Sequence, residues 1–124
     1  MAVVHRRSQR HMSDLRPYEC MVILDPELDE ETIRPEVERW VGQLEAHGAE
    51  RGYVDYWGKR RLAYEVKHRK EGYYVVFQAR ANPTSMTDLA RVLSLHDGVL
   101  RHKVLRVPES AYGPPAQVSG PPTE

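Results

Sequence analysis

The sequence is poor in cysteine and in long hydrophobic runs, and both shortages limit what the protein can be. A single cysteine, Cys20, excludes an internal disulfide and a metal site built from several cysteines. It lies in an alternating stretch, so we interpret it as a small core residue. No apolar run approaches the about 20 residues that cross a bilayer, so we expect no membrane partner. The 124 residues, 40% of them hydrophobic, suffice for one core rather than two.

Neither sign of charge dominates the chain, yet its two halves differ. The formal net charge is 0. Residues 19–56 hold eleven acidic residues against three arginines, a net of −8, and residues 57–107 hold eleven basic residues against four acidic ones, a net of +7. Solvated charge on helix surfaces explains most of the acids. The division also suits a particle component that meets RNA on one side and a basic protein on another.

Hydrophobic periodicity predicts six elements in the order strand, helix, strand, strand, helix, strand. The predicted elements are a strand at 16–24, a helix at 29–48, a long strand or bent pair at 49–67, a strand at 73–80, a helix from 82 and a strand at 99–107. Gly58 marks a bulge or kink, and residues 68–72 form a polar turn. The second helix begins at Asn82-Pro83, or two residues later at a capping box formed by Ser85 and Asp88.

The two ends of the chain differ from the middle in composition. Residues 1–15 are basic, with three arginines and no apolar stretch of the secretory kind, and we expect a disordered extension. Residues 108–124 are rich in proline and small polar residues, so we expect a flexible tail. The domain therefore spans residues 16–107.

This element order predicts an α+β fold, a ferredoxin-like βαββαβ sandwich with a four-stranded antiparallel sheet and two helices on one face. Right-handed crossovers place the first and third strands in the centre and the strand with Arg60 and Arg61 at an edge. The face without helices then presents apolar, aromatic and basic residues: Met21, Ile23, Tyr74, Val76, Arg101 and Lys103. A bare face of this kind is a candidate docking surface.

Motifs of catalysis and metal binding are missing. No Gly-rich phosphate loop, nucleophile elbow or Cys/His pairing occurs, and the six histidines lack metal-ligand spacing. The acidic cluster from Asp25 to Glu31 lacks the EF-hand spacing and its glycine, so we interpret it as charge that favours a helix N-terminus. We expect no enzyme, metal, cofactor or small-molecule substrate.

Six segments together resemble a known family. The segments are Arg16-Pro17-Tyr18-Glu19, Val22-Ile23-Leu24-Asp25-Pro26, Trp57-Gly58-Lys59-Arg60-Arg61-Leu62-Ala63-Tyr64 and Gly72-Tyr73-Tyr74, followed by Leu89 to Leu93 and Val99-Leu100-Arg101. Together they resemble bacterial ribosomal small-subunit protein six over about residues 16–107. The resemblance implies a non-enzymatic, cytoplasmic protein of the small ribosomal subunit that is a monomer when free. It also implies binding to the central domain of 16S ribosomal RNA together with small-subunit protein eighteen.

The basic residues divide into two sets of candidate site residues. The RNA set takes in the positions that the resemblance implies and the basic residues beside them: Arg16, Tyr18, Lys59, His68, Arg69, Lys70, Arg101 and Lys103. The protein-partner set lies on the charged edge strand: Asp55, Tyr56, Arg60 and Arg61. Guanidinium forks suit phosphate oxygens, and charge on an edge strand also blocks unwanted sheet pairing.

Two alternatives share the fold. An RNA recognition motif has the same element order and stacks single-stranded bases on strand aromatics. Tyr73 and Tyr74 are adjacent and point to opposite faces, so only Tyr74 of the two could meet a base. An acylphosphatase-like enzyme needs a phosphate-cradling loop after the first strand. Here that loop, residues 25–29, is acidic and would repel phosphate.

Overall fold

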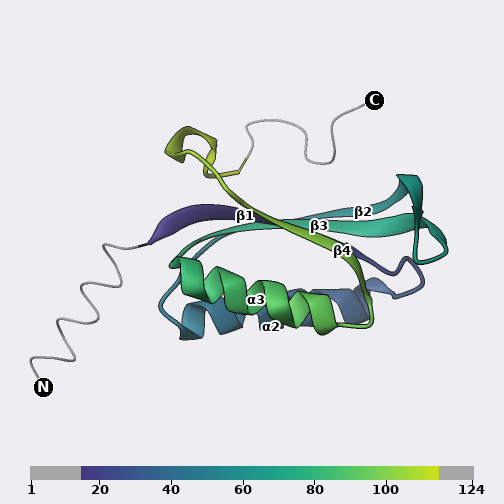
Figure 1. The fold of residues 1–124 in the computed structure, drawn as a ribbon, viewed down its shortest axis with the longest axis horizontal. Coiled ribbons are helices and arrows are strands. Elements are labelled where there is room, and N and C mark those ends of the chain that lie inside the picture. The colour runs from purple at the N-terminus through teal and green to yellow at the C-terminus, as the bar shows by residue number, and fades with distance from the viewer. Residues whose placement is uncertain (1–14, 115–124) are drawn as a thin grey trace, which may run out of the picture.

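The computed structural model describes residues 15–114 and contains one antiparallel sheet with two helices against it. The order along the chain is β1 (Arg16–Leu24), α2 (Glu30–Ala46), β2 (Glu50–Val66), β3 (Arg69–Ala81), α3 (Pro83–Leu95) and β4 (Val99–Arg106). The strand order across the sheet is β2-β3-β1-β4, and both helices lie on one side of it (Figure 1). The predicted ferredoxin-like fold is confirmed, with β1 and β3 central and the arginine-bearing β2 at an edge.

Local signals start both helices where the sequence predicts. The Asp29 side chain accepts a hydrogen bond from the backbone N–H of Thr32 at 2.9 Å and so caps α2. At α3 the Asn82 side chain accepts from the N–H of Ser85 at 2.8 Å, and proline occupies the first helical position. Of the two predicted starts for α3, the structure therefore has the one at Asn82-Pro83.

One hydrophobic core lies between the sheet and the helices. Its largest fully buried side chains are Trp40, Phe77, Leu24, Ile33, Leu44, Leu89 and Leu93. Alternation along β1 sends Cys20, Val22 and Leu24 into this core and leaves Met21 and Ile23 on the other face. Cys20 is 1% exposed, so its interpretation as a core residue is confirmed. This burial raises the pKa of its thiol to about 12.

The β2–β3 hairpin is longer than the sequence predicts. The turn consists of Lys67 and His68, with φ of 49° and 65°, and β3 begins at Arg69 rather than after a turn at 68–72. Two residues with positive φ match the right-handed twist of the flanking strands. The bulge at Gly58 is present, because the pairing register shifts between Tyr56 and Gly58 and Gly58 has a φ of 90°.

The segment after β4, where the sequence predicts a flexible tail from residue 108, contacts the sheet. Over residues 108–114, which we call the strap, the chain forms the short 3-10 helix η1 (Glu109–Ala111) and lies on the sheet face opposite the helices (Figure 1). Proline-rich composition does not predict the polar contacts that hold the strap on the sheet. These contacts are described below. The remainder of the predicted tail and residues 1–14 of the predicted extension lie outside the described residues.

Candidate RNA and protein interface

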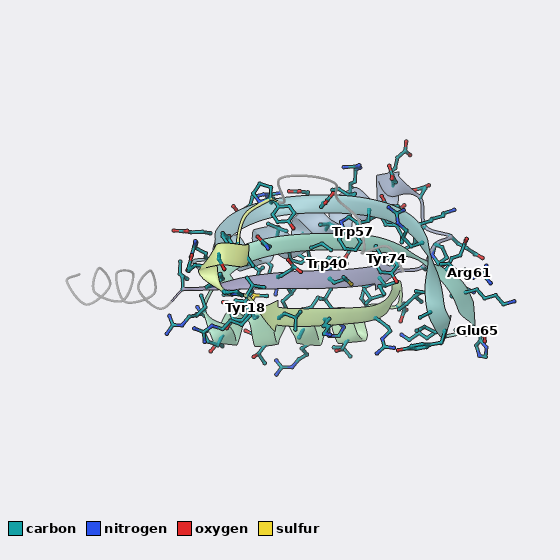
Figure 2. The ribbon with its side chains drawn as sticks, turned by 90° about the horizontal axis from the view of Figure 1, so that it is seen from above. Tyr18, Trp40, Trp57, Arg61, Glu65 and Tyr74 are labelled. Atoms are coloured by element: carbon teal, nitrogen blue, oxygen red, sulfur yellow. The ribbon has the colours of Figure 1, made fainter. Side chains whose placement is uncertain are left out.

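The sheet face without helices, called the open face, carries an aromatic pair at its centre. Trp57 and Tyr74 stack with ring centroids 6.0 Å apart and an interplanar angle of 13°, and Figure 2 shows them side by side on β2 and β3. Met21 and Ile23 of β1 are half-buried on the same face, because they pair with Val76 and Tyr74 of β3. The middle of the open face is therefore apolar and aromatic, as the alternation predicts.

The β2–β3 hairpin turns this patch into a groove. Beyond Gly58 the hairpin extends past the end of β1 and curves, and Arg61 and Glu65 mark its far end in Figure 2. The resulting groove has a volume of about 430 Å³. Its lining comes from three strands and the hairpin: Met21, Ile23, Leu62, Ala63, Tyr64, Val66, Tyr74, Arg101, His102 and Lys103. A groove of this character suits an apolar segment of a partner more than a phosphate.

The basic side of the groove is formed by β4. Arg101 and Lys103 are exposed opposite Ile23 and Met21, so the structure brings these two predicted RNA residues together. Arg101 donates a hydrogen bond to the Tyr64 hydroxyl and lies 5.5 Å from the centre of that ring. This contact joins the hairpin to the opposite edge of the sheet.

The turn residues at the hairpin tip have different surroundings. His68 and Lys70 are exposed, whereas Arg69 forms two hydrogen bonds to the Asp25 carboxylate, at 3.3 and 3.1 Å. These bonds lower the pKa of Asp25, with help from the backbone N–H of Glu27. Lys67 donates to the Val99 carbonyl at 3.2 Å. Arg69 thus holds the hairpin against the end of β1, in addition to its predicted RNA role.

The β2 edge alternates between the two faces. Asp55 lies on the open face and accepts a hydrogen bond from the Trp57 indole N–H at 3.1 Å. Tyr56 points to the helix side, where the Arg34 guanidinium sits 4.0 Å from its ring centre. Arg60 pairs in register with Gly72, and Arg61 with Glu71. The predicted partner residues therefore share a strand but do not form one patch.

Two predicted RNA residues lie at the opposite end of β1. Arg16 is half-buried and hydrogen-bonds to the Leu15 carbonyl at 3.5 Å. Tyr18 is 9% exposed and belongs to the core on the helix side. Lys59 is exposed beside the start of α2, next to a depression lined by Glu27, Glu30 and Glu71. The eight predicted RNA residues are therefore spread around the sheet rather than gathered, and their roles stay predictions.

Sequence reasoning missed the contribution of Trp57 and Tyr64. Strict alternation from Tyr56 places Trp57 on the open face, but the bulge at Gly58 moves the residues from Gly58 to Arg61 by one position. A second register shift follows between Arg61 and Val66, so alternation does not place Tyr64. Curvature of the hairpin then carries Tyr64 across to Arg101. Gly58 was the available signal in the sequence. It indicated a bulge but did not indicate on which face the later side chains of β2 would lie.

Metal-binding clusters and membrane-spanning helices are absent from the described part of the chain. Among residues 15–114 no cluster of three histidine, cysteine or acidic side chains could hold a metal ion. No helix in the same range is long and apolar enough to cross a membrane.

Comparison with known proteins decides the family. The sequence model of the family described as Ribosomal protein S6 matches residues 17–106. The chain belongs to this family. Small ribosomal subunit protein bS6 of Mycobacterium tuberculosis strain H37Rv is 50% identical over 92 residues, which cover 74% of this chain and 96% of that protein. The same protein of Nocardia farcinica is 48% identical over 92 residues, which cover 74% of this chain and 97% of that protein.

Solved structures agree with the fold. The crystal structure of 30S ribosomal protein S6 from Thermotoga maritima superposes with a TM-score of 0.70 at 29% identity, covering 75% of this chain and 88% of that one. Family membership confirms the predicted resemblance and makes the chain a structural, non-enzymatic ribosomal protein of the small subunit. The strap lies beyond the matched residues 17–106.

Proposed function

We propose that this protein binds the central domain of 16S ribosomal RNA jointly with small-subunit protein eighteen during assembly of the small subunit. The supporting observation is the groove on the open face, which joins apolar and aromatic residues to the exposed cations Arg101 and Lys103. Apolar lining favours a protein segment, and guanidinium and ammonium groups favour phosphate, so one surface can contact both partners.

The distribution of charge supports a shared site rather than independent RNA binding. Five of the eleven acidic residues of the first half lie on α2, and two of them, Glu38 and Glu45, pair with Arg51 of β2 at 2.5 Å and 3.6 Å. Most of the exposed cations of the second half lie on the hairpin and on β4, and Arg91 on α3 pairs with Asp88. A protein with net charge 0 has little long-range attraction for RNA, so we expect weak affinity alone and salt-sensitive binding after a basic partner is added.

Joint binding tests the edge assignment. Arg60→Glu with Arg61→Glu reverses two charges on β2, and we expect the joint complex with a 16S central-domain RNA fragment and protein eighteen to be lost. Gel-shift titration over a range of salt concentrations measures this. Arg91→Glu on the exposed surface of α3 is the matched control, since it reverses charge on the helix side of the sheet. Normal complex formation by the double variant, with the fold intact by circular dichroism, would refute the edge assignment.

Single-strand binding in the manner of an RNA recognition motif is the second candidate, because the open face presents Trp57 as well as Tyr74. Base stacking on such a platform is worth about 1–3 kcal/mol for each aromatic residue. Tyr74→Ala should therefore weaken binding to an unstructured oligonucleotide by about fivefold or more if this candidate holds. We expect the wild-type chain to bind such oligonucleotides weakly and Tyr74→Ala to change that affinity little.

A further inference from the structure

The strap makes polar contacts with one residue of β3 that is otherwise sealed from water. Gln78 is 2% exposed although it lies on the open face. Its amide nitrogen donates to the Ala111 carbonyl at 3.2 Å and to the Glu19 carboxylate at 2.9 Å, and its oxygen accepts from the Gly113 N–H at 2.7 Å. A buried amide needs such partners. Gln78 thus binds the strap by its backbone, as a receptor binds a peptide.

Arg80 of β3 contacts two side chains of the strap, those of Glu109 and Tyr112. Arg80 donates two hydrogen bonds to the Glu109 carboxylate, both at 2.7 Å, in the bidentate geometry that suits a guanidinium. The same guanidinium lies 4.4 Å from the centre of the Tyr112 ring. The Tyr112 hydroxyl lies over Gly52 of β2, where an added Cβ would be only 2.7 Å from it. Arg80 therefore recognises a carboxylate and an aromatic ring three residues apart.

The receptor residues lie within the family match, and the bound segment lies after it. Glu19, Gly52, Gln78 and Arg80 all lie within residues 17–106, which match the family, whereas the strap follows that match. No residue of the strap is buried, so an ion pair, two backbone hydrogen bonds and a ring contact hold it. Contacts of this kind open locally at much lower free energy than global unfolding.

We propose that Gly52, Gln78 and Arg80 form a peptide-binding site on the open face, and that the strap is its intramolecular ligand. The class of ligand is a short peptide with a carboxylate three residues before an aromatic residue that is followed by glycine. None of Gly52, Gln78 and Arg80 lines the groove of the proposed function. The strap lies close to one predicted RNA residue, because Pro108 and Glu109 line a depression together with Arg16.

Hydrogen exchange tests occupancy in the intact chain. We expect the Gly113 amide of the ¹⁵N-labelled wild-type protein to exchange at least about tenfold more slowly than in an unstructured peptide, because Gln78 accepts its hydrogen bond. The full-length double variant Glu109→Gln with Tyr112→Ala should lose this protection. Unprotected exchange of Gly113 in the wild-type chain would overturn the proposal, as would a dimer that exchanges straps, detected by sedimentation velocity at the same concentration.

A synthetic peptide of residues 108–114 tests the site itself. A tethered segment competes at an effective concentration of about 1 mM, so the free peptide should bind the double variant with a Kd of about 0.1 mM and the wild type about tenfold more weakly. Chemical shifts of the Gln78 side-chain amide report the binding. Adding Arg80→Ala to the double variant should remove it, whereas adding Arg91→Ala should not. Equal affinity of the wild type and the double variant for the peptide would contradict the proposal.

Discussion

The two halves of the open face are built from the same strands yet have opposite character. At the groove half, β1 and β3 contribute Met21, Ile23 and Tyr74, which are apolar or aromatic and leave a hollow of about 430 Å³. At the strap half the same strands contribute Glu19, Gln78 and Arg80, which hydrogen-bond to one another or to the strap. A buried polar group without a hydrogen-bond partner destabilises the folded chain. An exposed apolar group is tolerated in the free protein and can later be covered by a binding partner. The polar half is therefore closed within the chain, and the apolar half is open to another molecule.

Filling the floor of the groove should have the largest effect. A Cβ on Gly72 would lie 2.3 Å from Cγ2 of Ile23 and 3.4 Å from Cδ2 of Leu62, so Gly72→Val forces both away. We expect a loss of about 2–3 kcal/mol in the free energy of unfolding, by overpacking. Urea denaturation measures it. Gly42→Ala is the control, since nothing lies within 4 Å of its Cβ and alanine favours the α2 helix. Stability of Gly72→Val equal to that of the wild type would contradict the close packing of Gly72 against Ile23.

Removing the amide of Gln78 should have a smaller effect, confined to the strap half. Gln78→Met keeps the volume but leaves Glu19 and the strap backbone without their partner. We expect a loss of about 1–2 kcal/mol, because the strap can lift and hydrate its freed groups. Denaturation gives the loss, and exchange of the Gly113 amide gives the opening. Gln43→Met on α2 is the matched control. Unchanged stability together with a protected Gly113 would contradict the assigned role of Gln78.

The smallest effect concerns the ion pair that anchors the hairpin beside the groove. Arg69 holds the pKa of Asp25 below its usual range, so the pair contributes stability above about pH 4 and loses it as pH falls through the lower folded pKa. Arg69→Ala should lower Tm slightly at pH 7 and reduce the loss of Tm between about pH 5 and pH 2. Thermal scans across this range, with Arg91→Ala as control, measure the difference. Parallel pH profiles for the wild type and Arg69→Ala would refute the coupling.

The sequence predicted the strands and helices, which repeat a pattern or carry a local cap. It did not predict the geometry of the turn and of the bulge, which depends on single residues. Alternation in β1 and β3 and the caps at Asp29 and Asn82 predicted the fold, because each signal is local or periodic. The two-residue turn at Lys67 was missed, since neither of its residues is the glycine or asparagine that usually marks positive φ. On the open face, alternation predicted the positions of Arg101 and Lys103, while the positions of Trp57 and Tyr64 depend on the register shifts of β2.

The sequence by itself determined the element order, the central position of β1 and β3 and the division of charge between the halves of the chain. Tertiary structure alone decided that the hairpin curves until Tyr64 reaches Arg101, and that the strap returns over Gln78. The physical reason is the separation along the chain of the residues that interact. Periodicity and capping act between residues a few positions apart, whereas the groove and the strap depend on contacts across more than thirty residues, as between Tyr64 and Arg101. Those contacts form only after the sheet has brought the strands together.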